Sequence, residues 1–259
     1  MPAAVSSSKK YLAAMLTAAL SAALLSACAS ETSQIAGLSP NQAVAKACKA
    51  TLGAQGITAS TKVLSAAGPQ LTANLSFAAS DARGSLHYGN GASAQVLSHA
   101  KTLYLNGNAK FWKKTTAGIT IPQSILDRMA GVWLRNSAKS SVPTMRKSIL
   151  RYGDPKLVLA SCSAKGAFFA RAGRGEVHGA SVERFTGNVN GERISLSVAT
   201  SGKPYVLLVS SVGGPERLST EFSDFGKGVD VSIPTPNFDL VPILKILAGI
   251  QAMGLNPLG

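Results

Sequence analysis

Apolar and polar residues alternate along several stretches of this chain. Along residues 71–77, large apolar side chains and alanine alternate with threonine, asparagine and serine. The same period of two recurs along residues 194–198 and 218–222, and it is typical of a strand with one buried face. Residues 205–209 are apolar at every position, which predicts a central strand covered on both faces.

The strand pattern occupies two parts of the sequence. The first part runs from Ile57 to Gly107, and the second resumes after Gly175. Glycine, proline, asparagine and aspartate punctuate both parts. They predict turns at residues 68–69, 81–84, 89–91 and 202–204.

Helical patterns appear before and between the two strand regions. A first helix is predicted over residues 41–52, after the start signal Ser39-Pro40. A second stripe at helical spacing contains Ile121, Ile125, Met129 and Val132, with Trp133 beside it. A further helix is predicted at about residues 144–152. This order of strands, helices and strands predicts one α+β domain with a largely antiparallel sheet.

The C-terminal stretch differs from the rest of the chain. After Pro234-Thr235-Pro236, residues 238–253 are apolar nearly all round, with Lys245 as their only base. The stretch is too short to span a bilayer unaided, and such a helix must be buried in protein or in lipid. It therefore inserts beside an N-terminal anchor, covers a cavity mouth, or packs as an ordinary final helix.

Residues 1–27 have the layout of a signal peptide. Lys9 and Lys10 precede an uncharged, moderately apolar stretch from residue 11 to residue 25. The stretch ends in Leu25-Ser26-Ala27-Cys28, which resembles the bacterial lipobox. We therefore expect cleavage before Cys28, a diacylglyceryl thioether on its sulfur, and stable anchoring at the extracytoplasmic face of the cell membrane. An uncleaved anchor helix and a chance cysteine are the alternatives.

Charge narrows the expected partners. Loss of Lys9 and Lys10 lowers the net charge from +14 to +12. Nucleic acid is the usual partner of so basic a chain, but an exported protein does not meet it, so we expect no nucleic-acid partner. Anionic lipid headgroups and cell-wall polymers are the acidic surfaces at hand, and charge for solubility alone is the other interpretation. The sequence names no protein partner.

Two cysteines remain beside the lipidated one. In an oxidising compartment, an even pair such as Cys48 and Cys162 is expected to form a disulfide. Closing a loop of about 100 residues would stabilise the fold by about 4–5 kcal/mol. Two buried free thiols are the alternative.

Catalytic and metal-binding patterns are missing from the sequence. The three histidines, His87, His99 and His178, lack metal-ligand spacing with cysteine or acidic residues. There is no Gly-x-Ser-x-Gly elbow and no phosphate-binding glycine loop. Ser98 and Lys101 match Ser-x-x-Lys, but the companion motifs are missing. We expect no enzyme activity, no catalytic residue, no metal site and no cofactor.

Several segments, in this order, resemble the LppX/LprG type of lipoprotein of actinobacterial envelopes. They are Thr102-Leu103-Tyr104-Leu105 with Phe111-Trp112-Lys113; Gly131-Val132-Trp133-Leu134; residues 199–205; and residues 222–227 leading to 229–231. The resemblance implies a curved antiparallel half-barrel with helices across its concave side. It also implies an apolar cavity between them for lipids or acylated glycolipids. The Cys48/Cys162 pair and the tail after Pro236 depart from the pattern.

The resemblance completes the expected organisation. Residues 1–27 form the signal peptide, 28–40 the lipidated terminus and tether, 41–234 the lipid-binding domain, and 235–259 the Pro-rich break and apolar helix. The residues expected to bind lipid are Leu71, Leu75, Phe77, Leu103, Leu105, Ile125, Met129, Trp133, Ile149, Leu196, Val198 and Leu207. Those expected to attract the headgroup are Arg146, Lys147 and Arg151.

Two functions are compatible with this sequence. The first is a membrane-anchored lipoprotein that binds or transfers a lipid or acylated glycolipid. The second is a non-enzymatic envelope adaptor or sensory lipoprotein with the same fold and a packed interior. A co-purifying lipid would separate them.

Overall fold

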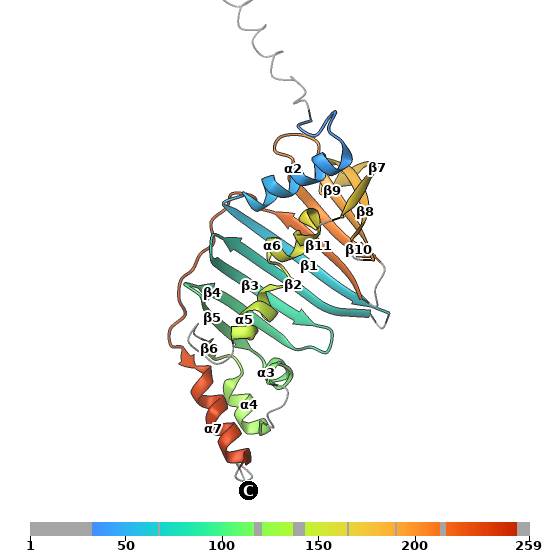
Figure 1. Ribbon diagram of the computed structural model, residues 1–259. Coiled ribbons are helices and arrows are strands. Elements are labelled where there is room, and N and C mark those ends of the chain that lie inside the picture. Colours follow the sequence, from blue (N-terminus) through green and yellow to red (C-terminus); the bar gives the residue numbers. More distant parts are fainter. Residues whose placement is uncertain are drawn as a thin grey trace, which may run out of the picture.

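The computed structural model describes residues 33–66, 68–116, 121–136, 143–164, 166–189, 191–212 and 216–252. Within them, a wide sheet carries helices on one of its faces (Figure 1). The predicted signal peptide and Cys28 lie outside the described residues.

The chain enters the fold through helix α2 (Pro40–Leu52). Ser39 Oγ accepts a hydrogen bond from the Gln42 amide, and the Gln42 side chain accepts one from the Ser39 amide, so a capping box starts the helix where the sequence predicts it. An antiparallel meander follows, confirming the first predicted strand region. Its strands are β1 (Gly56–Ser65), β2 (Gly68–Ala78), β3 (Asp81–Tyr88), β4 (Ser93–His99) and β5 (Thr102–Gly107).

Short helices and one strand separate this meander from the next. They are α3 (Ala109–Thr115), α4 (Gln123–Met129), β6 (Trp133–Asn136), α5 (Pro143–Leu150), α6 (Pro155–Val158) and a 3₁₀ turn at Ala160–Ser163. Helices α4 and α5 confirm a helix in each of the two middle patterns, although Ile121 and Val132 of the first pattern lie outside α4.

A second antiparallel meander completes the sheet. Its strands are β7 (Phe168–Val177), β8 (Ala180–Val189), β9 (Glu192–Ala199), β10 (Val206–Val212) and β11 (Glu216–Ser223). After an extended segment, β12 (Phe238–Asp239) pairs in parallel with β6 and leads directly into α7 (Leu240–Ala252). The apolar tail therefore joins the sheet before it becomes helical.

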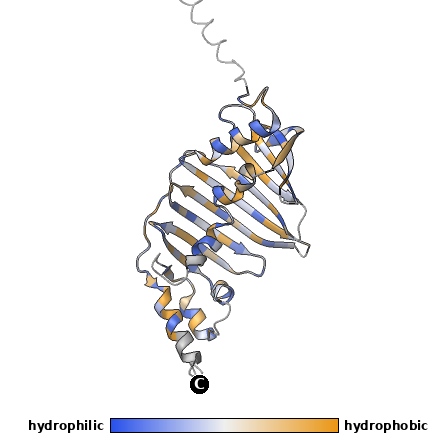
Figure 2. Cartoon of the chain, in the orientation of Figure 1, coloured by the Kyte–Doolittle hydropathy of each residue, from blue (hydrophilic) through white to orange (hydrophobic). Residues whose placement is uncertain are grey.

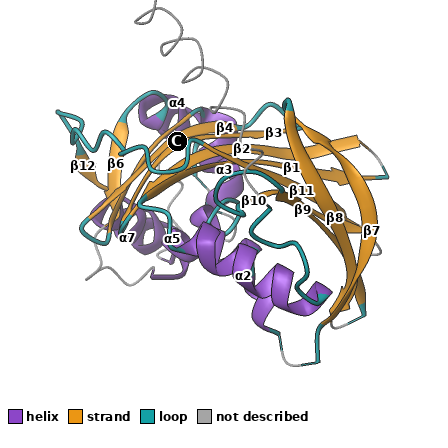
Figure 3. Cartoon of the chain, turned by 90° about the horizontal axis from the view of Figure 1, so that it is seen from above, coloured by secondary structure: helices purple, strands orange, loops and turns teal. Residues whose placement is uncertain are grey.

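The described strands form one open sheet in the order β12-β6-β5-β4-β3-β2-β1-β11-β10-β9-β8-β7. The two meanders meet where β1 pairs with β11, and β7 and β12 lie at opposite edges. Seen from above, the sheet bends into an arch with α2 and α5 on its concave side (Figure 3). This architecture confirms the predicted curved α+β fold.

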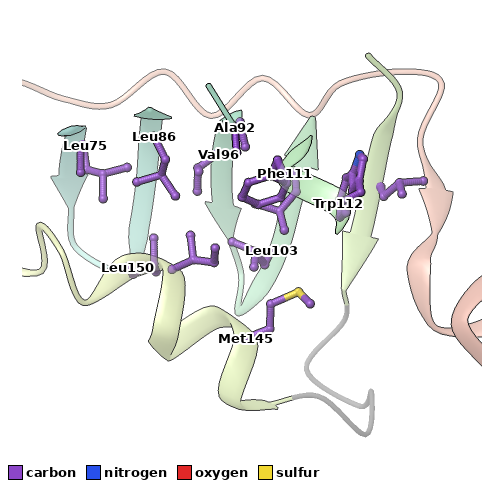
Figure 4. Packing of buried hydrophobic residues seen from close by; sticks show 14 of the residues in the cluster. Leu75, Leu86, Ala92, Val96, Leu103, Phe111, Trp112, Met145 and Leu150 are labelled. Carbon is purple, nitrogen blue, oxygen red and sulfur yellow. The ribbon is translucent and has the colours of Figure 1, made fainter. Parts of the chain in front are cut away.

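One apolar cluster lies under the β2–β6 half of the sheet. Phe111 and Trp112 of α3 are fully buried in it, and Met145 and Leu150 of α5 pack down onto the strands (Figure 4). The Trp112 indole N–H donates to the Met129 carbonyl at 3.1 Å, so its polar atom is satisfied. This cluster holds α3, α4 and α5 against the sheet.

A second cluster lies under the other half of the sheet. It packs α2 against Phe169, Phe185 and the apolar residues of β9 and β10. The Cys48–Cys162 disulfide links α2 to the 3₁₀ turn, with a Cα–Cα distance of 6.4 Å, and confirms the predicted pairing. The Thr51 hydroxyl also accepts a hydrogen bond from the Val206 amide at 2.8 Å, which fixes the end of α2 to β10.

Several local predictions were wrong. Residues 68–69 belong to β2 rather than to a turn, since Gly68 already pairs with Ser65 of β1. Residues 81–84 form the start of β3 rather than a turn, because the chain reverses earlier, at Ala79 (φ 51°) and Ser80. Gly84 instead permits close packing, since a Cβ there would lie 1.8 Å from the Asn74 carbonyl oxygen. The second strand region begins at Phe168 rather than after Gly175, because β7 is an edge strand whose mostly exposed residues show no buried alternation.

Trp133 also lies elsewhere than the helical pattern suggested. Helix α4 ends at Met129, the chain turns at Gly131 (φ 75°), and Trp133 begins strand β6. Ile125 and Met129 therefore share a helix, whereas Trp133 pairs with Asn106 of β5.

Candidate functional site

The segment from α5 to α6 lies directly on the concave face of the sheet. Its turn contains Gly153, where a Cβ would lie 3.1–3.2 Å from side-chain atoms of Leu75 and Phe77 on β2. This contact leaves no room for a ligand between the turn and the middle of β2. The space between helices and sheet is consequently divided into cavities on either side of the α5–α6 segment.

The first of these, the central cavity, lies between the end of α2, the α5–α6 segment and strands β1–β3. Its volume is about 520 Å³, within the range of small-molecule sites. Its apolar lining includes Ile57, Phe77, Ala82 and Leu150. A chain of methylenes would find apolar contacts there.

Cations gather at the polar part of the central cavity. Lys101, Arg146 and Lys156 line it together with the carboxylates of Asp81 and Asp154. Arg146 is oriented by two hydrogen bonds, from Nε to Ser98 Oγ at 2.9 Å and from Nη2 to the Ser80 carbonyl at 3.3 Å.

Each carboxylate of this cavity already has a partner. Asp81 contacts the His99 ring at 3.1 Å, and Asp154 accepts a hydrogen bond from the Lys156 amide at the start of α6. The polar part of the cavity is therefore suited to an anionic group.

The second space, the lateral cavity, lies between α6 and strands β9–β11. It has a volume of about 370 Å³ and an apolar lining that includes Leu157, Ile194 and Val209. Its charged residues are Arg151 and Glu192. The Arg151 guanidinium stacks over the Tyr152 ring, with its Cζ 4.7 Å from the ring centroid. This contact already occupies part of the guanidinium.

A third hollow, the end groove, lies at the β6 end of the sheet. It has a volume of about 480 Å³ between α4, β6, β12 and α7. Its lining is nearly all apolar and includes Ile125, Met129, Val132, Leu134, Phe238 and Ile243.

The structure scatters the twelve residues expected to bind lipid. Leu71, Leu75, Leu103, Leu105 and Ile149 are buried in the first cluster, and Leu196 and Val198 in the second. Ile125 and Met129 line the end groove, and Phe77 lines the central cavity. Trp133 and Leu207 are half-buried on β6 and β10. Most of this set is packed against other side chains rather than facing open space.

The three expected headgroup residues are also separated. Arg146 faces the central cavity and Arg151 the lateral cavity, whereas Lys147 is exposed on α5 and lines none of the three hollows described here. Sequence reasoning missed Lys101 and Lys156. Lys101 follows β4 in a tight turn, and Asp154-Pro155 was an available helix-start signal for the short helix that carries Lys156.

Two features are absent from the part of the chain that the structure describes. There, no three histidine, cysteine, aspartate or glutamate side chains gather in a way that could hold a metal ion. Nor does any helix in these ranges combine the length and apolar character needed to cross a membrane. Lipidation of Cys28 concerns a residue outside them and stays a prediction.

Known structures share this architecture. No protein-family model and no curated protein matches the sequence. The crystal structure of LprF from Mycobacterium bovis matches with a TM-score of 0.50 and 12% identity, covering 75% of this chain and 96% of that one. The chain has the LppX/LprG-type fold. Lipoprotein LppX of Mycobacterium tuberculosis gives a TM-score of 0.49 and 12% identity, over 74% of this chain and 97% of that one.

Within the LppX/LprG-type fold, the α5–α6 segment of this chain divides the space under the sheet. The contact of Gly153 with Leu75 and Phe77 separates the central cavity from the lateral one. Any ligand long enough to occupy both cavities must pass around or displace the α5–α6 segment.

Proposed function

We propose that this protein is a lipid-anchored envelope lipoprotein that binds an acyl lipid in its central cavity. The acyl chain would lie on Phe77 and Leu150, and the anionic headgroup would be bound by Arg146, Lys101 and Lys156. The observation that carries this proposal is the pairing of an apolar lining with three cations in one cavity. The proposal assigns the chain no catalytic residue.

The fold supports the proposal without specifying the ligand. An open, curved sheet offers more apolar surface than its own helices cover, and the three hollows are the result. An anionic headgroup held by Arg146 would gain charge-assisted hydrogen bonds, which are stronger than neutral ones. Anchoring through Cys28 would place the cavity at the extracytoplasmic face of the cell membrane, beside its lipid source.

Native mass spectrometry tests lipid binding directly. Residues 28–259 with Cys28→Ser contain every described element, and this form should retain a non-covalent lipid after purification from cells. Arg146→Gln should lower the occupied fraction several-fold. Lys147→Gln is the matched control, because it removes the same charge from the exposed face of the same helix.

The same experiment tests the adaptor function. The two apolar clusters fill much of the space under the sheet, and this observation favours an adaptor with a packed interior. A clean apo mass, together with no uptake of added anionic phospholipid, would exclude the lipid-binding proposal and support the adaptor. Equal occupancy of the two variants would instead remove the headgroup role of Arg146.

A further inference from the structure

The β6 end of the molecule exposes large apolar side chains. The exposed fraction is 53% for Phe238 and 62% for Ile246, and Pro242 between them is also exposed. All three lie on β12 or α7, next to the open end groove, and Figure 2 shows hydrophobic residues along this helix. Contiguous exposed apolar surface of this kind marks a site of contact with a partner or a membrane.

Basic residues flank this apolar surface. Arg128 of α4 lines the end groove, Lys245 projects from α7, and both are exposed. Neither forms an ion pair with another described residue. The nearby Asp239 accepts two hydrogen bonds from Arg135, at 2.5 and 2.9 Å. Asp127 of α4 accepts one from the Gln123 side chain and has no cationic partner among the described residues.

We propose that Arg128, Phe238, Pro242, Lys245 and Ile246 form a membrane foot that binds the surface of an anionic bilayer. The apolar side chains would enter the boundary between headgroups and acyl chains. The long basic side chains would lie along the apolar surface and reach the phosphates. Helix α7 has 13 residues, about 20 Å in length, so it would lie in the interface rather than cross the bilayer.

The foot lies at the opposite end of the sheet from the N-terminal side of the domain. The first described residues, 33–38, lie at the other end of the sheet, where Arg171 of β7 donates to the Leu38 carbonyl at 2.7 Å. Twelve strands spaced about 4.8 Å apart separate the two edges by roughly 50 Å when measured along the curved sheet. Contacts at both ends would therefore hold the long axis of the domain parallel to the membrane surface. In this arrangement the tail does not insert beside Cys28.

The foot is independent of the central-cavity proposal. Its residues line neither the central nor the lateral cavity. Variants of the foot should therefore keep any lipid that co-purifies with the protein, so failure of one proposal is distinguishable from failure of the other.

Vesicle binding tests the foot without the acyl anchor. Residues 28–259 with Cys28→Ser should co-sediment with phosphatidylcholine vesicles that contain phosphatidylglycerol, and less with phosphatidylcholine alone. Phe238→Glu with Ile246→Glu should weaken this binding by about tenfold or more, because two buried apolar contacts are lost. Phe168→Glu is the matched control, since Phe168 is even more exposed (69%) and lies on β7 at the opposite end.

A depth measurement complements the binding assay. Brominated acyl chains should quench a tryptophan at Phe238→Trp and leave one at Phe168→Trp unquenched. If the glutamate variants melt at a lower temperature, the double variant Arg128→Gln with Lys245→Gln is tested in their place. It should bind vesicles with and without phosphatidylglycerol equally. The proposal is overturned if the parent protein does not bind these vesicles, if foot and control variants bind equally, or if the foot variants only dissociate a dimer.

Discussion

The hydroxyls of Thr61 on β1 and Thr220 on β11 are hydrogen-bonded to each other at 2.8 Å and are completely buried. They are 159 residues apart in sequence, and they lie where the two meanders join into one sheet. Replacing Thr61 alone by Val should cost about 1–3 kcal/mol of unfolding free energy, because the Thr220 hydroxyl is left buried without a partner.

A double-mutant cycle checks this relationship. Thr61→Val with Thr220→Val removes both polar groups, so most of the loss should be recovered. Urea unfolding of the three variants gives the coupling energy. Losses that simply add would show that the two hydroxyls act independently.

Removal of the Cys48–Cys162 bond should destabilise the protein strongly. The bond closes a loop with a sequence separation of 114, and the chain-entropy relation gives about 4–5 kcal/mol for a loop of that length. Cys48→Ala with Cys162→Ala is compared with the oxidised protein by urea unfolding. Peptide mapping without reductant should recover both cysteines in one linked peptide pair, and two free alkylated thiols would contradict the assignment.

Cys28→Ser should abolish lipidation. The predicted lipobox would place the thioether on this residue, and a hydroxyl would not be alkylated in its place. Metabolic palmitate labelling with detergent partitioning measures the effect, and Cys48→Ser serves as the control that keeps its label. Unchanged labelling of the Cys28 variant would contradict the predicted anchor.

The stability of the fold should depend on the protonation of Tyr88. Burial of this residue, helped by Tyr152 and opposed by Arg151, raises its pKa from 10.0 to about 12. The folded state therefore favours the neutral phenol. This stabilisation is fully present below pH 10 and is lost as the pH rises towards 12. Tyr88→Phe should lose less stability than the parent between pH 10 and pH 12 when both are unfolded in urea, and parallel curves would contradict the assignment.

Gly84→Ala should lower the unfolding free energy by about 1–3 kcal/mol, because its Cβ would lie 1.8 Å from the Asn74 carbonyl oxygen. Gly228→Ala is the matched control, since a Cβ there meets no atom within 4 Å, and its effect should stay within about 0.5 kcal/mol. Thermal melting of both variants measures the difference, and equal melting temperatures would contradict the tight packing at Gly84.

Local patterns predicted much of the fold. Ser39, Pro40 and Gln42 define the start of α2 within the reach of a few bonds, so the sequence shows it directly. The alternation along residues 71–77 places Leu71, Ala73 and Leu75 on the buried face of β2, because a strand has a side-chain period of two. Cys48 and Cys162 could be paired because no other cysteine remained after Cys28 was assigned.

The hollows depended on contacts between distant segments. Arg146 was identified from its helix, but Lys101 and Lys156 join it only because α5 and α6 fold back over β2 and β3. The end groove likewise requires α4 to meet a tail that lies more than 100 residues further along the chain.

The sequence by itself therefore determined the strands, the main helices, the disulfide pair and the expected anchor residue. The tertiary structure decided that β1 pairs with β11, that Gly153 packs on Leu75 and Phe77, and that the apolar tail forms one wall of an open groove. The physical reason is range. Capping and periodicity act between residues a few positions apart, whereas a cavity depends on which distant surfaces meet and on how completely their side chains fill the space between them.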